Sequence, residues 1–184
     1  MRHRFTGSWV YELPLGKGHR LWGKLHGVLG MLTQGWMLNG VVIMQTGQPS
    51  SVILPAELDN SNTGISFMGG AADRPNINGN PVLKNPDPSR WFATDVFTMP
   101  TFGSFGTAGR NIVTGPSFKN IDLSLLKVTT LNKSAKLQMR LEFFNLFNTP
   151  NFHQPNIIFG TPSFGRVLSA HAGREVQLGL KVIF

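Results

Sequence analysis

The chain has 184 residues, of which only 14% are charged, whereas glycine (21), proline (12) and phenylalanine (14) are abundant. A soluble domain usually carries roughly 25–35% charged residues on its surface, so this composition argues against an ordinary water-facing surface. The net charge is +8, but the lysines and arginines are scattered singly, which disfavours a nucleic-acid-binding protein. The sequence has no cysteine, which permits an oxidising compartment without requiring one.

Membrane-spanning helices are not expected. The longest aliphatic stretches, such as residues 41–44, run for about four residues, whereas a spanning helix needs about twenty. A membrane protein of this composition would have to be a β-barrel, because lipid offers no partners for unpaired backbone groups. Residues 1–6 run straight into strand-like alternation and do not form a signal peptide.

The first predicted strand covers residues 4–13 and ends before Pro14. Its apolar residues occupy alternate positions, with polar residues between them, which is typical of a strand with one apolar face. The apolar positions are Phe5, Gly7, Trp9, Tyr11 and Leu13. A second strand is predicted over residues 35–48, with less clearly divided faces. Residues 21–32 are expected to hold a short helix weakened by its glycines.

Residues 49–118 have a different character. Prolines, glycines, asparagines and serines recur throughout, and neither a strand nor a helix period persists. A loop of this length is unusual in a compact domain and is normally functional or disordered. Its many aromatic residues argue against disorder. We therefore expect a folded loop.

Three further strands are predicted, over residues 119–129, 134–146 and 174–184, with a second loop at 147–173. From Ala135 to Phe143 every odd position is apolar and every even position is polar. The polar turn at residues 130–133 makes the first two of these strands a hairpin. The last strand repeats the alternation, with Val176, Leu178, Leu180, Val182 and Phe184 on one face.

Alternation alone leaves the environment of the strands open. Strands with one polar face also build soluble β-sandwiches, lipocalin-like barrels and lectin domains. The terminus favours a membrane barrel, because apolar residues occupy every second position from Val176 to the terminal Phe184. This pattern resembles the C-terminal signature of bacterial outer-membrane barrels, which the barrel-assembly machinery recognises.

Other motifs narrow the resemblance. The segment 140–152, with Asn145-Leu146-Phe147, resembles the penultimate-strand motif of TonB-dependent receptors, and residues 173–175 resemble the start of their last strand. Several motifs resemble the Oar-like subgroup and occur in its order along nearly the whole chain. They are Arg2–Phe5, Tyr11–Pro14, Arg74–Asn76, Trp91-Phe92, Phe105–Asn111, Gly115-Pro116 and Asn120–Ser124.

The resemblance implies an all-β fold, an antiparallel transmembrane β-barrel segment. Residues 1–184 would supply the C-terminal part of the barrel, about five or six of its roughly twenty-two strands, in the bacterial outer membrane. Loops 49–118 and 147–173 would be extracellular, and the turn at 130–133 periplasmic. Five or six strands cannot close such a barrel, and the family's N-terminal plug and TonB-engaging motif are not found. We therefore expect a fragment of a longer receptor.

The resemblance also implies the partners. They would be outer-membrane lipid, the barrel-assembly machinery, an unidentified ligand, and the TonB system acting through the missing plug; no nucleic-acid partner is expected. Loop residues Arg90, Trp91, Arg110 and Asn111 are candidates for ligand contact, because exposed aromatic and arginine side chains often anchor binding. The alternative is that they hold the long loop against the barrel rim.

Catalytic and metal-binding chemistry is not expected. The five histidines show no metal-ligand spacing, and the sequence has no Gly-x-Ser-x-Gly elbow. Asp122 and Glu142 are expected to be polar residues of the barrel lumen, paired with Arg140 or Lys136. The predicted function is therefore ligand uptake as part of a receptor, without a cofactor and not as an enzyme. The alternative function is a soluble or surface β-sandwich that binds carbohydrate or protein.

Overall fold

The computed structural model describes residues 2–16, 21–55, 57–64 and 72–184. The chain divides into two compact units. The sheet unit comprises Arg4–Met44, Lys119–Pro150 and Ala172–Phe184, and the loop unit comprises Met1–His3, Gln45–Phe118 and Asn151–His171. In the part of the chain that is described, no helix is both long and apolar enough to cross a membrane.

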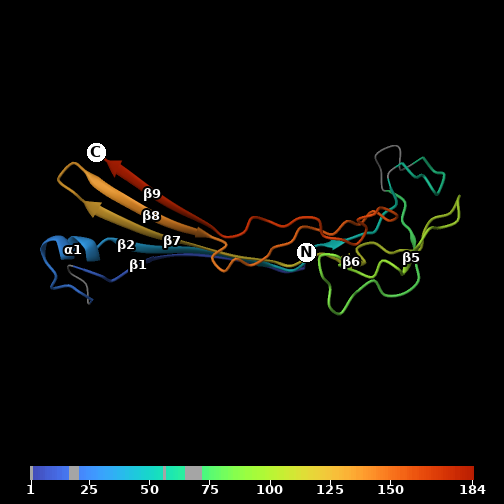
Figure 1. Ribbon diagram of the computed structural model, residues 1–184, viewed down its shortest axis with the longest axis horizontal. Coiled ribbons are helices and arrows are strands. Elements are labelled where there is room, and N and C mark those ends of the chain that lie inside the picture. Colours follow the sequence, from blue (N-terminus) through green and yellow to red (C-terminus); the bar gives the residue numbers. More distant parts are fainter. Residues whose placement is uncertain (1, 17–20, 56, 65–71) are drawn as a thin grey trace. The chain divides into compact units, whose positions relative to one another are not determined.

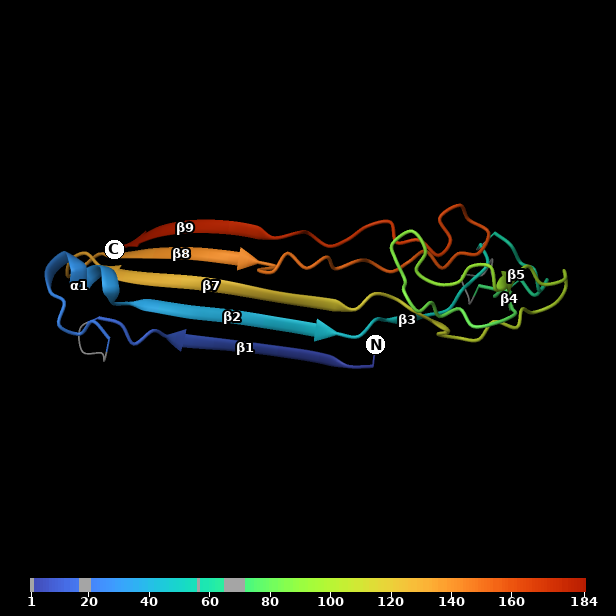
Figure 2. The same ribbon diagram turned by 60° about the horizontal axis from the view of Figure 1, so that its bottom comes forward.

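The sheet unit is built on five strands in the order β1-β2-β7-β8-β9. Figure 2 shows that neighbouring strands run in opposite directions. Each segment predicted to be a strand overlaps one of them, and the ends differ by at most three residues. The strands are β1 (Arg4–Glu12), β2 (Trp36–Gln45), β7 (Phe118–Thr130), β8 (Lys136–Phe144) and β9 (Glu175–Ile183).

A tight turn joins β7 to β8, as the sequence predicts. Thr130 still pairs with Lys136, so the turn begins one residue later than expected. The Leu131 N–H donates to the Ala135 carbonyl (2.9 Å), and the Asn132 side-chain oxygen accepts the N–H groups of Ser134 (2.9 Å) and Ala135 (2.8 Å). An Asx turn of this kind satisfies the backbone locally.

The register of β8 against β9 sorts the side chains by polarity. Met139 lies opposite Leu180 and Leu141 opposite Leu178, whereas Gln138 lies opposite Lys181. Because directly opposite residues of an antiparallel pair point to the same side, one face is apolar and the other is polar. The pairing of β7 with β8 continues the apolar face, since Leu125 lies opposite Leu141, whereas Leu126 and Val128 lie on the polar side opposite Arg140 and Gln138.

The apolar side extends to β1 and β2, although the opposite side of β2 also carries Met37, Val41 and Ile43. A Cβ atom at Gly40 would overlap the ring of Trp9, so these two residues share a side and the glycine makes room for the indole. Lys127 Nζ lies 4.9 Å from the centre of the Trp36 ring, which places Trp36 on the side of the odd-numbered residues of β7. We call this side the apolar face. Its members include Phe5, Trp9, Tyr11, Trp36, Leu38, Val42, Leu123, Leu125, Leu137, Met139, Leu141, Phe143, Val176, Leu178, Leu180 and Val182.

Lys127 is a buried charged residue on the apolar face. Its side chain is only 3% exposed, because α1 (Gly27–Thr33), in the connection between β1 and β2, covers it. Its ammonium group donates to the carbonyls of Met31 (3.0 Å), Leu32 (3.0 Å) and Gln34 (2.9 Å). These carbonyls lie at the C-terminal end of the helix, where they lack intrahelical partners and carry partial negative charge.

This contact explains how so short a helix forms. Helix α1 has seven residues and no side-chain N-cap, and it begins six residues later than the segment expected from the sequence. An isolated helix of this length is not stable in water. The lysine from β7 and the Trp36 indole, which donates to the Leu32 carbonyl (2.9 Å), hold its C-terminal end against the sheet.

Two asparagines tie the end of β8 to its neighbours. Asn145 has a left-handed backbone (φ 50°), and its N–H donates to the Asp122 carboxylate (2.9 Å). Its side chain bonds both the N–H and the carbonyl of Thr149 (2.9 and 3.0 Å). The side-chain oxygen of Asn148 accepts the N–H of Arg174 (3.0 Å), just before β9 begins. The Asn-Leu-Phe and Gly-Arg motifs therefore meet at one end of the sheet.

The loop unit has its own hydrophobic core, as expected of a folded loop. Val52, Phe92, Phe97, Ala108 and Val113 form its buried centre. Phe164, from the second predicted loop, contacts Phe92 and Phe97 edge to face at 5.3 and 5.7 Å. The two predicted loops thus fold together. Short strand pairs reinforce them: β3 (Pro49–Ser50) with β6 (Val113–Thr114), and β4 (Asn76–Ile77) with β5 (Phe97–Thr98).

We expect Lys127→Met to lower the free energy of unfolding by about 1.5–3 kcal/mol, because a charged donor is lost while the carbonyls of α1 stay covered. Urea unfolding of the protein in detergent micelles measures this. Lys136→Met is the matched control, since Lys136 is exposed on the polar face of the adjacent strand. Equal effects of the two substitutions would contradict a specific role for Lys127.

Candidate functional site

The apolar face of the sheet is not part of a packed core. Leu178 is 69% exposed and Leu180 is 66% exposed, in the middle of β9. Among the described residues, the buried apolar side chains belong to the loop unit, apart from Ala135. The soluble alternative requires these apolar side chains to be covered inside a globule. On β9 they are exposed instead, and on β7 and β8 they are at most partly buried.

The opposite face has the chemistry of a water-lined surface. Arg140 and Glu142 lie two residues apart on the same side of β8 and form an ion pair, with 3.8 Å between Arg140 Nη1 and Glu142 Oε1. The sequence predicts this pairing for Glu142. Asp122 has a different role, because its carboxylate accepts hydrogen bonds from the Asn120 side chain (2.8 Å) and the Asn145 N–H. Alternating lipid-facing and lumen-facing residues are typical of transmembrane barrel strands.

The length of the strands fits a membrane. At a rise of about 3.3 Å per residue, the nine residues of β8 extend for roughly 30 Å. A tilted strand of this length crosses an apolar band about 25 Å tall. The sheet therefore supplies one lipid-facing and one water-facing surface over the thickness of a bilayer.

The predicted C-terminal assembly signal lies on the apolar face of the sheet. Val176, Leu178, Leu180 and Val182 occupy alternate positions of β9 on the apolar face, and Phe184 follows the last strand residue with 95% exposure. These side chains are accessible from outside the sheet, as recognition by an assembly factor requires. Their role as a signal stays a prediction.

The four predicted ligand-contact residues separate into two pairs. Arg90 pairs with the Asp95 carboxylate, and the Trp91 indole donates to the Thr114 carbonyl (2.9 Å) while its ring packs against the core of the loop unit. These two side chains are engaged in holding the loop unit together. Near Arg90, the Ser89 hydroxyl and N–H hold the pKa of Asp87 below its ordinary value.

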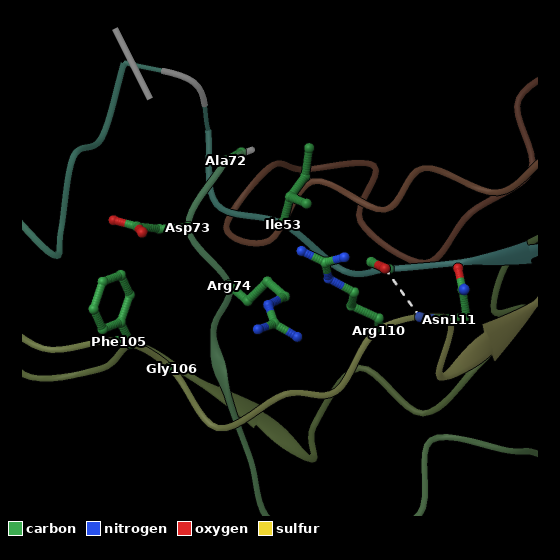
Figure 3. Close-up of a pocket in the computed structure, with 9 residues that line it drawn as sticks. Ile53, Ala72, Asp73, Arg74, Phe105, Gly106, Arg110 and Asn111 are labelled. Carbon is green, nitrogen blue, oxygen red and sulfur yellow. Dashed lines mark hydrogen bonds between the residues drawn. The ribbon is translucent and has the colours of Figure 1, made fainter. Parts of the chain in front are cut away.

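Arg110 and Asn111 line an open pocket of about 560 Å³ within the loop unit. Figure 3 shows that the guanidinium groups of Arg74 and Arg110 both reach into this space. Phe105 forms one wall, and the Asn111 N–H donates to the Ser51 hydroxyl (2.9 Å) on another. The lining of the pocket therefore includes two guanidinium groups, one acidic residue (Asp73), polar backbone and one exposed aromatic ring.

The two arginines carry uncompensated positive charge. Within the described residues, no carboxylate forms an ion pair with Arg74 or Arg110. The neighbouring Asp73 is buried, and its carboxylate accepts the Ser61 N–H (2.7 Å) and points away from both guanidinium groups (Figure 3). Paired guanidinium groups in a pocket suit a carboxylate, phosphate or sulfate group, which they can bind through two parallel hydrogen bonds.

A close backbone contact builds the pocket. A Cβ atom at Gly106 would overlap the carbonyls of Arg74 and Pro75, so only glycine lets the two segments approach. The Ala108 N–H donates to the Pro75 carbonyl (3.0 Å), and the Thr107 N–H donates to the Asn76 side chain (3.1 Å). Both segments are among the motifs that resemble the Oar-like subgroup, but nothing in the sequence predicts that they pair, or that Arg74 and Phe105 share a pocket with Arg110.

Sequence reasoning also missed a pair of histidines in the loop unit. The rings of His153 and His171 lie 4.1 Å apart, and Phe118 contacts His171 edge to face. The two histidines are eighteen positions apart in the sequence, so no local motif predicts that they meet. Among residues 2–16, 21–55, 57–64 and 72–184, no group of three His, Cys, Asp or Glu side chains is placed to hold a metal ion.

A charge placed on each face of β9 tests the two environments. Leu178→Arg should cost about 2–4 kcal/mol if this position contacts the middle of a bilayer. Gln177→Arg, on the opposite face of the same strand, should be nearly neutral because it contacts water. The free energy of unfolding from lipid vesicles measures both. Equal losses would show that the two faces do not differ in environment.

Comparison with known families agrees with this geometry. Residues 1–177 match the outer membrane beta barrel domain family. No curated protein and no solved structure matches the chain. The match spans most of the sequence, and the open apolar face, the polar opposite face and the strand lengths are those of a barrel wall. The chain belongs to the outer membrane beta barrel domain family and is a protein of the bacterial outer membrane.

Proposed function

We propose that this chain is part of a TonB-dependent receptor, which binds a ligand at the cell surface and admits it across the outer membrane. The observation that carries the proposal is the pairing of receptor-like motifs. Arg74–Asn76 bonds to Phe105–Asn111, and the segment around Asn145 bonds to Asp122 and, through Asn148, to Arg174. Motifs that resemble one subgroup thus contact one another in the fold.

The connections of the sheet support an orientation. The chain passes from the sheet into the loop unit at the ends of β2 and β8, and it returns at the starts of β7 and β9. These four points lie at the same end of the antiparallel sheet. The β7–β8 turn and Phe184 lie at the other end (Figure 1). Outer-membrane barrels have long loops outside and short turns in the periplasm. We therefore assign the loop unit to the cell exterior.

The sheet is open, and its two edge strands are β1 and β9. An unpaired strand edge in lipid is costly, because its N–H and C=O groups find no partner there. We propose that further strands pair with both edges and complete a barrel of about twenty-two strands. Energy for uptake would then come from the TonB system through a plug domain that these residues do not include.

The loop pocket indicates the kind of ligand. Arg74 and Arg110 are free of carboxylate partners within the described residues, and Phe105 offers a ring for stacking. We propose that the pocket binds an anionic group of the transported compound. The proposal assigns no catalytic step to the chain, since transport needs only binding and passage. The exposed apolar face argues against the alternative function, a soluble β-sandwich that binds carbohydrate or protein.

Removing the charges of the pocket tests the ligand assignment. Arg74→Gln and Arg110→Gln should each weaken binding of an anionic ligand by about tenfold or more, because each removes a charge-assisted hydrogen bond. Arg90→Gln is the control, since Arg90 pairs with Asp95. Isothermal titration of the full-length protein with carboxylate, phosphate and sulfate compounds measures the effect. Equal losses in all three variants would contradict the assignment.

Dependence on TonB tests transport separately. Cells that lack TonB should keep surface binding of the ligand but lose its accumulation in the periplasm, because only the energised step needs TonB. Accumulation of radiolabelled ligand with and without TonB measures this. Unchanged accumulation would exclude a TonB-dependent receptor and leave a passive outer-membrane channel.

The terminal residue tests the assembly signal. Deleting Phe184 from the full-length protein should lower the amount of folded protein in the outer membrane, whereas Phe184→Tyr should preserve it, because the aromatic ring remains at the same position. Heat-modifiable mobility on gels and surface labelling measure the folded fraction. An unchanged folded fraction after the deletion would contradict a role in assembly.

A further inference from the structure

The connection between β1 and β2 exposes a second apolar surface. Val28 is 72% exposed and Leu29 is 61% exposed, and Trp22 and Leu32 are also exposed. Helix α1 contains no charged residue in its first or last turn. A short helix whose outer side consists of valine and leucine is unfavourable in water, where apolar surface is costly to hydrate.

The helix lies on the lipid side of the sheet. Lys127 belongs to the apolar face, and its ammonium group bonds the carbonyls at the C-terminal end of α1. Figure 1 shows α1 at the end of the sheet where β2 begins. The apolar residues of the helix therefore continue the surface that the family places against lipid.

We infer that α1 and Trp22 form an interfacial anchor, which lies in the boundary between headgroups and acyl chains of the leaflet at the turn end of the barrel. Amphipathic interfacial helices bury their apolar side in this boundary and keep polar groups at the surface; α1 would supply an apolar side of the same kind over a shorter length. Trp22 and Trp36 have the side chain that is enriched at membrane interfaces. Lys24, exposed between Trp22 and the helix, can reach the headgroups.

The position of α1 on the apolar side of the sheet indicates that lipid, and not a protein partner, covers its exposed residues. A plug or a ligand inside the barrel would meet the polar face, which carries Gln138, Arg140 and Glu142. The helix lies on the opposite side, next to Trp36 and Lys127. A partner at that position is surrounded by the same lipid that contacts Leu180 and Leu178.

The anchor also has a function for the sheet. A lysine on the lipid face is destabilising, and the cost is smallest near the interface. By covering Lys127 with backbone carbonyls, α1 keeps its charge out of the acyl chains and is itself held at the interface. The inference rests on membership of the outer membrane family, and it does not depend on the proposed transport function.

Spin labelling tests the inference, because residues 1–184 contain no native cysteine and any cysteine elsewhere in the full-length protein can first be replaced by serine. Nitroxide labels are attached to Val28→Cys and Leu29→Cys in the full-length protein, reconstituted in phospholipid vesicles. Leu180→Cys on β9 is the lipid-exposed control, and Ser134→Cys in the β7–β8 turn is the water-exposed control. Power saturation compares collisions with oxygen, which concentrates in lipid, and with a nickel chelate, which stays in water.

The expected result is greater access to oxygen than to nickel at positions 28, 29 and 180, and the reverse at 134. Greater access to nickel at 28 and 29 would overturn the inference, as would protection from both reagents, which indicates that protein covers the helix. A water-like result at 180 would instead overturn the orientation of the sheet. A lipid-like result at positions 28 and 29 in vesicles, together with ligand accumulation in cells that does not depend on TonB, would leave the anchor intact and remove only the transport proposal.

Discussion

The register between neighbouring strands is the constraint on which the rest of the structure depends. Side chains alternate along a strand, so shifting β8 by one residue against β9 would move Leu141 and Met139 to the side of Gln138 and Lys181. The apolar face would then mix with charge across the sheet. Strands β7, β8 and β9 keep one consistent register, and this consistency separates a lipid side from a water side. Among the described residues of the sheet unit, no cluster of buried apolar side chains performs this task, whereas the loop unit has one.

Lys127 shows how the fold accommodates a violation of that rule. Its position in β7 directs it to the apolar face, opposite Met139. The violation is tolerated because α1 supplies three carbonyl acceptors and the Trp36 ring contacts the cation. The helix depends equally on the lysine, since seven residues without an N-cap do not form a helix alone. Neither feature is stable without the other, and together they fix the β1–β2 connection on one side of the sheet.

The sequence predicted the strands well and the sites poorly, for a physical reason. Alternation with a period of two is a local property of the sequence. Residues 135–143 and 174–184 therefore predict β8 and β9 whichever strands pair with them. Helix α1 is harder to place from the sequence, because its C-terminal end is held by Lys127, about a hundred positions away. The pocket is non-local in the same way. Arg74 and Arg110 are brought together by the pairing of two loop segments that have no period of their own.

The motifs that carry the family resemblance are the points where these non-local contacts are made. Gly106 lets one loop segment touch the backbone at Arg74, and Asn145 and Asn148 adopt left-handed conformations at the end of β8. Asparagine is among the few residues that tolerate this backbone and also supply a side-chain hydrogen bond. Such positions accept few substitutes, whereas Val, Leu and Ile can replace one another on the lipid face with little consequence. A family of barrels can therefore vary its wall freely while it keeps the contacts that hold the loops, and with them the pocket, in one arrangement.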